Sequence, residues 1–276
     1  YIIMNDNSYQ PDGNQLGIEL HAMFYQYSTG NYLNNTTFLN LRAINRSNKE
    51  YYNYRQALFL DFDIGNYSDD HVGCDPSNRL LYAYNGDDFD ESDGGQIGYG
   101  ANPPCQGVLC LSHPLESAGR LTGSMDAGMN TSFDTTAWLL MNGQNSDSSY
   151  WMNPLTNTAT QFLYDGNPNL PNTWSEVSSN NSPGDRRGML CISEALFPQN
   201  STVCSDYAFV YDRSGDRLQN VQQNIYTAGA LLTWYAQDQV FPCQSQAFNS
   251  IRESDQALEP LHLYPNPTSQ QVTVAW

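Results

Sequence analysis

Apolar and polar residues alternate along the first quarter of the chain. The alternation runs through residues 16–27, 36–46 and 52–63. It is the pattern expected of strands with one buried and one exposed face. The segments 36–46 and 52–63 are joined by the polar connector SNKEY, which suits a hairpin. We therefore expect three strands here, with the last two paired to each other.

Short apolar runs continue the strand pattern in the second half of the chain. Polar connectors rich in Pro and Asn separate these runs, which are residues 135–142, 160–164, 187–193 and 203–212. Residues 94–133, in contrast, are rich in Gly and Pro and contain only the short apolar run 108–111. We expect this region to form a loop that packs over the sheet.

One segment, residues 214–237, has helical periodicity. The apolar residues that recur there at three-, four- and seven-residue steps are Leu218, Val221, Ile225, Leu232 and Tyr235. This spacing predicts an amphipathic helix of about five turns that packs its apolar stripe on a sheet. Ser214 is a plausible N-cap, and Asp216 would lie near the positive end of the helix.

These elements predict a mainly β protein. We expect an antiparallel β-sandwich of jelly-roll character, with long loops and one C-terminal amphipathic helix. The sandwich domain would span residues 1–250, followed by a polar linker over 251–262. Residues 263–276 would begin a further, truncated domain with one short strand, QVTVAW.

Composition narrows the class of protein. The 276 residues carry a formal net charge of −18, only 14% of them are charged, and 13% are aromatic. Such a polar, Tyr- and Asn-rich composition is typical of extracellular β domains. The negative charge argues against binding to nucleic acid or to an anionic membrane surface. No apolar run reaches the roughly 18–20 residues that a transmembrane segment needs.

The chain contains six cysteines without the spacing of a zinc finger. An even number in an acidic, polar chain suggests disulfides and an oxidising compartment. Cys191 and Cys204 lie in two neighbouring apolar runs and could form a cross-strand bond. Cys105 and Cys110 could close a tight loop, which would leave Cys74 to pair with Cys243. The alternative is that some of the six are buried free thiols.

A dense run of carboxylates lies between Asp61 and Asp93, where nine aspartates and one glutamate face a single arginine, Arg79. Short carboxylates separated by Gly and Asn suit a folded-back loop around Ca²⁺, which takes six to eight oxygen ligands. The candidate ligands are Asp61, Asp63, Asp69, Asp70, Asp75, Asn85 and Asp87. The run is not an EF-hand, because the twelfth residue from Asp61 is Val72. The alternative is a solvated acidic loop without an ordered ion.

Other groups of chemically active residues give weaker evidence for a functional site. Four further carboxylates could serve a glycosidase, which needs two acids about 5–9.5 Å apart, but no spacing singles out a pair among Glu19, Glu116, Glu176 and Glu194. His71, next to Asp70, is better explained as a charge partner than as a catalyst. The sequence GDRR at 184–187 could recognise a carboxylate or sulfate, but a buried ion pair that holds a loop to the sheet is the preferred interpretation.

Two segments carry a resemblance to known proteins. The segment from Leu263 to Thr268 reads LYPNPT, and its first five residues are Leu263, Tyr264, Pro265, Asn266 and Pro267. It resembles the start of the C-terminal sorting domain of type IX secretion substrates in Bacteroidetes. Further upstream, DFDIG, DDHVGCD and YNGDD are similar to the D-x-D-x-G, DD-x-x-G-C-D and Y-N-G-D core of large secreted Bacteroidetes proteins of unassigned function.

The resemblance implies where the protein is located and does not imply a catalysed reaction. It implies export across the outer membrane through secretion and surface-attachment machinery, and residence outside the cell or on its surface. We therefore expect a non-enzymatic structural or adhesive protein stabilised by calcium. Two alternatives are a secreted glycan-binding or glycan-hydrolysing protein and a subunit of an extracellular filament that self-associates by adding a strand to a neighbour's sheet.

Overall fold

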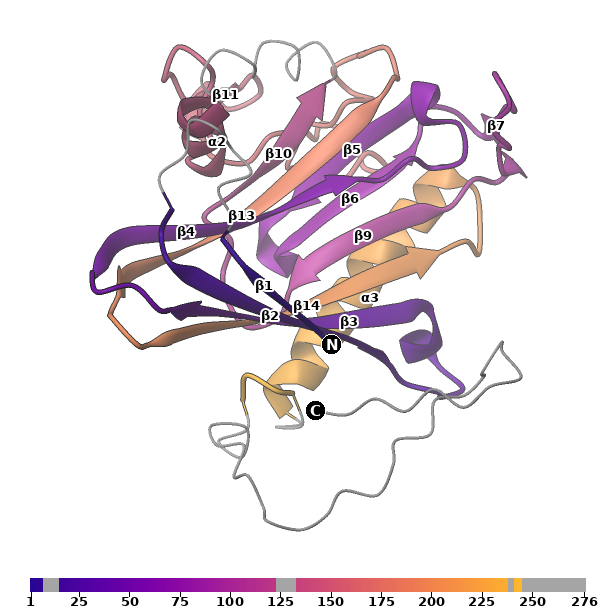
Figure 1. Cartoon of the computed structure of the whole chain (residues 1–276). Coiled ribbons are helices and arrows are strands. Elements are labelled where there is room, and N and C mark those ends of the chain that lie inside the picture. Colours follow the sequence, from indigo (N-terminus) through magenta and orange to yellow (C-terminus); the bar gives the residue numbers. More distant parts are fainter. Residues whose placement is uncertain (7–14, 123–132, 238–240, 245–276) are drawn as a thin grey trace.

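Two antiparallel sheets and one long helix make up most of the described part of the chain. The structure is a computed structural model that describes residues 1–6, 15–122, 133–237 and 241–244. The larger sheet has seven strands in the order β1 (Ile2–Asn5), β2 (Ile18–Gln26), β3 (Thr36–Asn45), β14 (Thr202–Asp212), β9 (Cys105–Cys110), β6 (Leu80–Asn85) and β5 (Asp70–Asp75). The smaller sheet has three, in the order β10 (Ser117–Thr122), β13 (Arg186–Phe197) and β4 (Tyr51–Asp61). The expected mainly β sandwich is confirmed (Figure 1).

The inner faces of the two sheets share one apolar core. Alternate residues of β6 from the larger sheet, Leu81 and Ala83, contact the same cluster as Leu190 and Ile192 of β13 from the smaller sheet. The side chains of a strand point to opposite faces in turn, so each strand contributes every second residue to this core. This packing makes a sandwich of the two sheets.

The helix α3 (Arg217–Gln237) covers the outer face of the larger sheet (Figure 1). Val221 and Leu231 of α3 are fully buried against Tyr82 and Tyr84 of β6. Strand β6 is therefore covered on both sides, and all six of its residues are buried. A strand covered on both faces reads as a nearly continuous apolar run, as LLYAYN does.

Short elements complete the described chain. They are the 3₁₀ turns η1 (Tyr32–Asn35), η2 (Tyr67–Asp69) and η3 (Pro76–Asn78), the small strand pairs β7 (Phe89–Asp90) with β8 (Gly100–Ala101) and β11 (Trp151–Asn153) with β12 (Thr158–Thr160), and the helix α2 (Phe133–Met141). The helix α2 occupies most of the segment 135–142 that was expected to be a strand. Short apolar runs do not distinguish a strand from a buried helix. Only Thr160 of the expected strand 160–164 belongs to a strand.

The predicted hairpin between the second and third strands is wrong. Strand β3 belongs to the larger sheet and pairs with β2 and β14, whereas β4 belongs to the smaller sheet and pairs with β13. The connector after β3 therefore crosses from one sheet to the other. Alternation establishes that a strand has a buried face, but it does not identify the neighbouring strand.

Much of the acidic run and of the expected loop over 94–133 is strand. β5 and β6 form a hairpin inside the acidic run, and β9 and β10 lie within the Gly- and Pro-rich region. The tight turn of the hairpin is η3, which Asp75 caps by accepting hydrogen bonds from the backbone of Ser77 and Asn78. The strands in these regions were missed because their short apolar runs lie among many aspartates and glycines.

The helix α3 lies where the periodicity predicted it, but it begins later than expected. Its apolar stripe packs on the sheet as predicted. The first helical residue is Arg217, and Asp216, not Ser214, caps it. The Asp216 carboxylate accepts from the Gln219 backbone N–H, and the Gln219 side chain accepts from the Asp216 N–H. This reciprocal pair is a capping box.

One disulfide is present, between Cys204 of β14 and Cys243, with a Cα–Cα distance of 5.5 Å. The expected pairings are wrong. Cys191 and Cys204 lie in different sheets, and Cys105 and Cys110 are the two ends of the same extended strand. Cys74 lies on β5 at the edge of the larger sheet, and β6 and β9 separate that strand from β14. The four other cysteines, Cys74, Cys105, Cys110 and Cys191, are buried free thiols.

The linker 251–262 and the segment 263–276 with its sorting motif lie outside the described residues. Among the helices that are described, none combines the length and the apolar character needed to cross a bilayer.

Candidate metal centre

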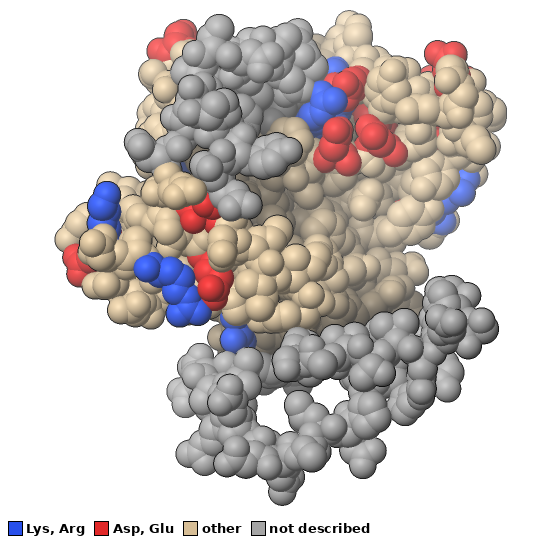
Figure 2. Space-filling view, viewed as in Figure 1, with Lys and Arg blue, Asp and Glu red and all other residues tan. Residues whose placement is uncertain are grey.

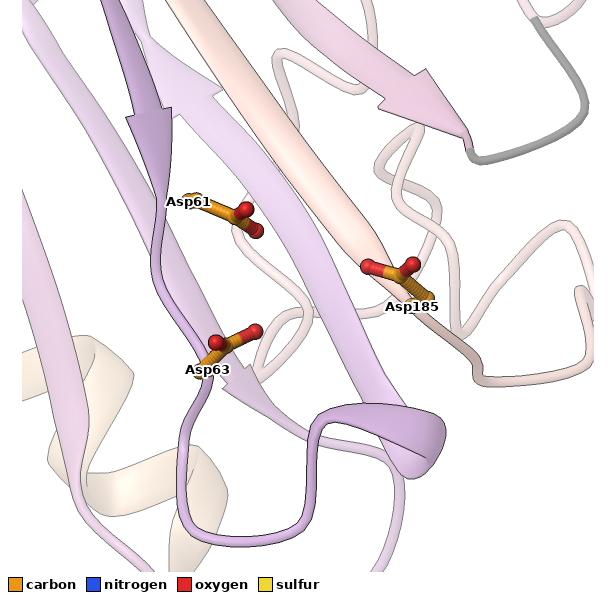
Figure 3. Close-up of side chains that lie close together, drawn as sticks. All are labelled: Asp61, Asp63 and Asp185. Atoms are coloured by element: carbon orange, nitrogen blue, oxygen red, sulfur yellow. The ribbon is translucent and has the colours of Figure 1, made fainter. Parts of the chain in front are cut away.

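Three aspartates meet where two strands of the smaller sheet end. Asp61 is the last residue of β4, Asp63 follows it by two positions, and Asp185 lies directly before β13. The two strands are antiparallel, with Asp61 opposite Arg187, so the exit of β4 lies beside the entry of β13. One carboxylate oxygen from each aspartate lies within 4.8 Å of the others. The three side chains point toward one another (Figure 3).

The loop after β4 is held in place by buried carboxylates. The backbone N–H of Ile64 donates to Asp70 Oδ2 at 3.0 Å, and that of Asn66 donates to Asp90 Oδ1 at 3.1 Å. Gly65 has a φ of +61°, and a Cβ at this position would lie 1.9 Å from Asp90 Oδ2. Only glycine allows this approach. These contacts fix the backbone beside Asp63, which itself has a φ of +43°.

The charge of the triad is only partly neutralised. Arg187 Nε lies 3.0 Å from Asp61 Oδ2, and its NH2 group lies 3.3 Å from Asp185 Oδ2. Burial raises the pKa of Asp63, and the neighbouring carboxylates of Asp61 and Asp185 raise it further. Three carboxylates and one guanidinium leave two negative charges (−3 + 1 = −2). Figure 2 shows acidic side chains beside a basic one where β4 ends and β13 begins.

Behind the triad lies a buried polar pair. Asp70 and Asn85 are directly opposite each other on β5 and β6, and both point to the inner face of the sheet. Burial raises the pKa of Asp70 to about 9. Asp70 Oδ1 and Asn85 Oδ1 are both buried without a hydrogen-bond donor among the described residues. Buried oxygens without a donor on two paired residues suit a bound cation or a proton.

The other three predicted ligands lie apart from the triad. Asp69 lies on η2, and burial, followed by the Asp90 carboxylate, raises its pKa to about 6. The Asp87 carboxylate accepts from the Phe89 backbone. Asp75 caps η3 at the far end of β5, about 16 Å from Asp70 at 3.3 Å per residue. Asp75 therefore cannot share an ion with Asp70, and its role as a ligand of a separate ion stays a prediction.

Sequence reasoning missed Asp185 as a member of the cluster. It lies more than a hundred residues from Asp63, and only the pairing of β4 with β13 brings the two together. The GDRR segment does contain Asp185, and its two arginines indicated that acidic partners would lie nearby. Arg187 pairs with Asp61 and Asp185, and Arg186 pairs with the fully buried Glu176. The structural interpretation of GDRR as a buried ion pair agrees with this geometry.

The carboxylates considered as hydrolytic acids are each engaged in an ion pair. Glu176 binds Arg120 at 2.6 Å and Arg186 at 3.3 Å. The remaining pairs are Glu19 with Arg46, Glu116 with Arg55 and Glu194 with His113. His71 is buried, hydrogen-bonded to the Asn181 carbonyl and shifted by burial to a lower pKa. Burial disfavours the charged form of His71, and the expectation that it acts as a charge partner stays a prediction.

Comparison with models of known protein families gives no match for this chain, and comparison with the sequences of curated proteins gives none either. The chemistry of the triad therefore has to be judged from its geometry. Three carboxylates supply up to six hard oxygen donors at an exposed loop, and water can supply more. This donor set suits Ca²⁺, which accepts a flexible shell of six to eight oxygens.

Proposed function

We propose that this protein is an exported, non-enzymatic structural or adhesive protein of the cell surface, stabilised by calcium. The observation that carries the calcium part is the convergence of Asp61, Asp63 and Asp185 at the ends of two paired strands. A divalent cation there would neutralise the two remaining negative charges and join the exit of β4 to the entry of β13. Extracellular Ca²⁺ is abundant enough to fill sites of millimolar affinity.

The calcium part is tested by thermal unfolding in excess Ca²⁺ and in EDTA. At about 100 times its Kd, the ion stabilises the folded state by about 2.7 kcal/mol, which raises the Tm by about 5–10 °C. Asp63→Asn removes one ligand charge and should abolish most of this rise. Asp93→Asn, at an exposed aspartate of the same acidic run, is the matched control and should keep it. An equal Tm in Ca²⁺ and EDTA would rule out a stabilising site.

The proposal that the protein is exported rests on the LYPNPT motif and on the oxidised cysteine pair. Disulfides such as Cys204–Cys243 form and persist in oxidising compartments. The motif resembles a sorting signal, and its prolines and asparagine are the residues to change. In the source bacterium, the Asn266→Ala/Pro267→Ala variant should accumulate inside the outer membrane, while the unchanged chain reaches the surface. Equal surface amounts of the two proteins, measured by protease shaving, would contradict a role for the motif.

A further inference from the structure

The outward face of α3 carries no charged side chain. The only Asp, Glu, Lys or Arg in this helix is Arg217, its first residue, which forms an ion pair with Asp88 at 3.3 Å. A surface helix normally presents charged residues to solvent. The chain as a whole carries 29 acidic and 11 basic residues. The outward face of α3 is therefore an uncharged strip on a strongly acidic protein.

This strip forms one wall of a groove. The groove has a volume of about 650 Å³ and lies between α3, Tyr32 of η1 and Asn78 of η3. Gly229 and Ala230 line the groove, and Gly229 allows Asn78 to approach the helix closely, since a Cβ at position 229 would lie 3.1 Å from Asn78 Oδ1. The volume falls in the range of small-molecule sites, about 300–1,000 Å³.

Aromatic rings line the groove and are held in different ways. Tyr226 is 70% exposed and Tyr32 is 37% exposed, so both rings are accessible to a ligand. Trp234 is fixed from behind by edge contacts with Tyr27, Phe38 and Phe241. A ring fixed in this way offers an apolar surface that loses little entropy when a ligand binds.

Neutral hydrogen-bonding groups lie between the rings. Gln222 Oε1 accepts from Asn167, which leaves the amide N–H groups of Gln222 to donate to a ligand. The side-chain amide N–H of Asn78 donates to Asp75. The side-chain carbonyl oxygen of Asn78 therefore remains an acceptor toward the groove. Two positioned amides of opposite hydrogen-bonding character recognise hydroxyl groups, which both donate and accept.

We propose that this groove binds a neutral oligosaccharide of about two or three sugar units. The apolar faces of the sugar rings would pack on Tyr226 and Trp234, and the hydroxyl groups would bond to Gln222 and Asn78. The absence of charge from the strip disfavours acidic and cationic ligands. Of the residues that the structure describes, ten line the groove. The inference does not rest on the cation site.

The test is a binding screen of the intact protein against four neutral trisaccharides, which are maltotriose, cellotriose, mannotriose and triacetylchitotriose. Calorimetry then measures the affinity for each one that binds. Tyr226→Ala should weaken binding by about tenfold or more, because it removes the most exposed ring. Ala230→Leu, which fills the groove without removing a ring, should weaken it as well. Tyr52→Ala is the control, since Tyr52 is also 70% exposed but lies on β4.

Three outcomes would overturn the inference. These are no binding of any neutral trisaccharide at millimolar concentration, equal binding by the wild type and both groove variants, and binding confined to sulfated or carboxylated glycans on an array. A Tm equal to that of the wild type would show that a variant is folded. Binding that persists in EDTA and in Asp63→Asn would support the groove even if the calcium site fails, so the two proposals can fail separately.

Discussion

Asp212 shows what burial does to a single carboxylate in this protein. It is the last residue of β14, it is 9% exposed, and it accepts a hydrogen bond from Asn224 of α3 at 3.0 Å. Burial raises its pKa to about 6, above the value near 3.9 of an unfolded chain. The folded protein therefore binds this proton more tightly. The resulting stabilisation is complete below about pH 4 and is lost as the pH rises through about 6.

We therefore expect Asp212→Asn to stabilise the protein at neutral pH. The amide keeps an acceptor for Asn224 and removes the charge that burial disfavours. In thermal unfolding, the variant should melt a few degrees above the wild type near pH 7.5 and equally with it near pH 4. Asp93→Asn, at an exposed position, should show no such trend. A gain that is the same at both pH values would assign the effect to something other than this ionisation.

Among the elements, three strands from both sheets share one carboxylate. Glu176 Oε2 lies 2.6 Å from Arg120 of β10, and Glu176 Oε1 lies 3.3 Å from Arg186 of β13. Glu176 Oε1 also accepts from the backbone N–H of Val72 on β5 at 3.1 Å. Glu176 is fully buried, so these contacts connect the smaller sheet to the edge of the larger one in a low-dielectric setting.

Replacing Glu176 by Gln should strongly destabilise this connection. The change leaves two guanidinium groups without a charged partner, and breaking a buried ion pair costs roughly 3–5 kcal/mol. The free energy of unfolding from urea titrations measures the effect, and Glu91→Gln at an exposed position is the matched control. The triple variant Arg120→Met/Glu176→Leu/Arg186→Met should recover part of the loss, because it removes all three charges. A loss below 1 kcal/mol for Glu176→Gln would contradict the proposed connection.

The disulfide attaches the chain after α3 to β14. The bond joins Cys204 to Cys243 across a sequence separation of 39, and loop-closure entropy gives a stabilisation of roughly 4 kcal/mol. Cys243→Ser should lower the free energy of unfolding by that order. Reductant should lower it equally in the wild type and not at all in the variant. Alkylation of the unfolded, unreduced protein should modify four cysteines, and mass spectrometry that counts another number would contradict this pairing.

For the whole molecule, the shared core predicts one cooperative unit. The inner cluster contains residues of both sheets, and α3 packs on the larger one. Variants that retain only Trp174, packed with Met189 of β13, or only Trp234 of α3 should therefore report the same unfolding midpoint by fluorescence as far-UV circular dichroism does. Two different midpoints would show that the described chain unfolds as two separate units.

The sequence by itself determined the class of fold and the long helix. Alternation between residues 16 and 63 and periodicity over 214–237 are local consequences of having one buried face, so they can be read without knowing the partners. The density of aspartates also pointed to the loop that holds Asp61 and Asp63. Both aspartates were among the candidate calcium ligands.

Only the tertiary structure decided which elements meet. The pairing of β4 with β13 brings Asp185 to Asp61 and Asp63, and it places Arg187 between two of them. The position of Cys204 beside Cys243, the burial of Glu176 and the groove on α3 likewise depend on contacts between distant segments. Periodicity specifies the face that a segment buries. The neighbour on that face is selected by how all the buried faces pack together, which no single segment encodes.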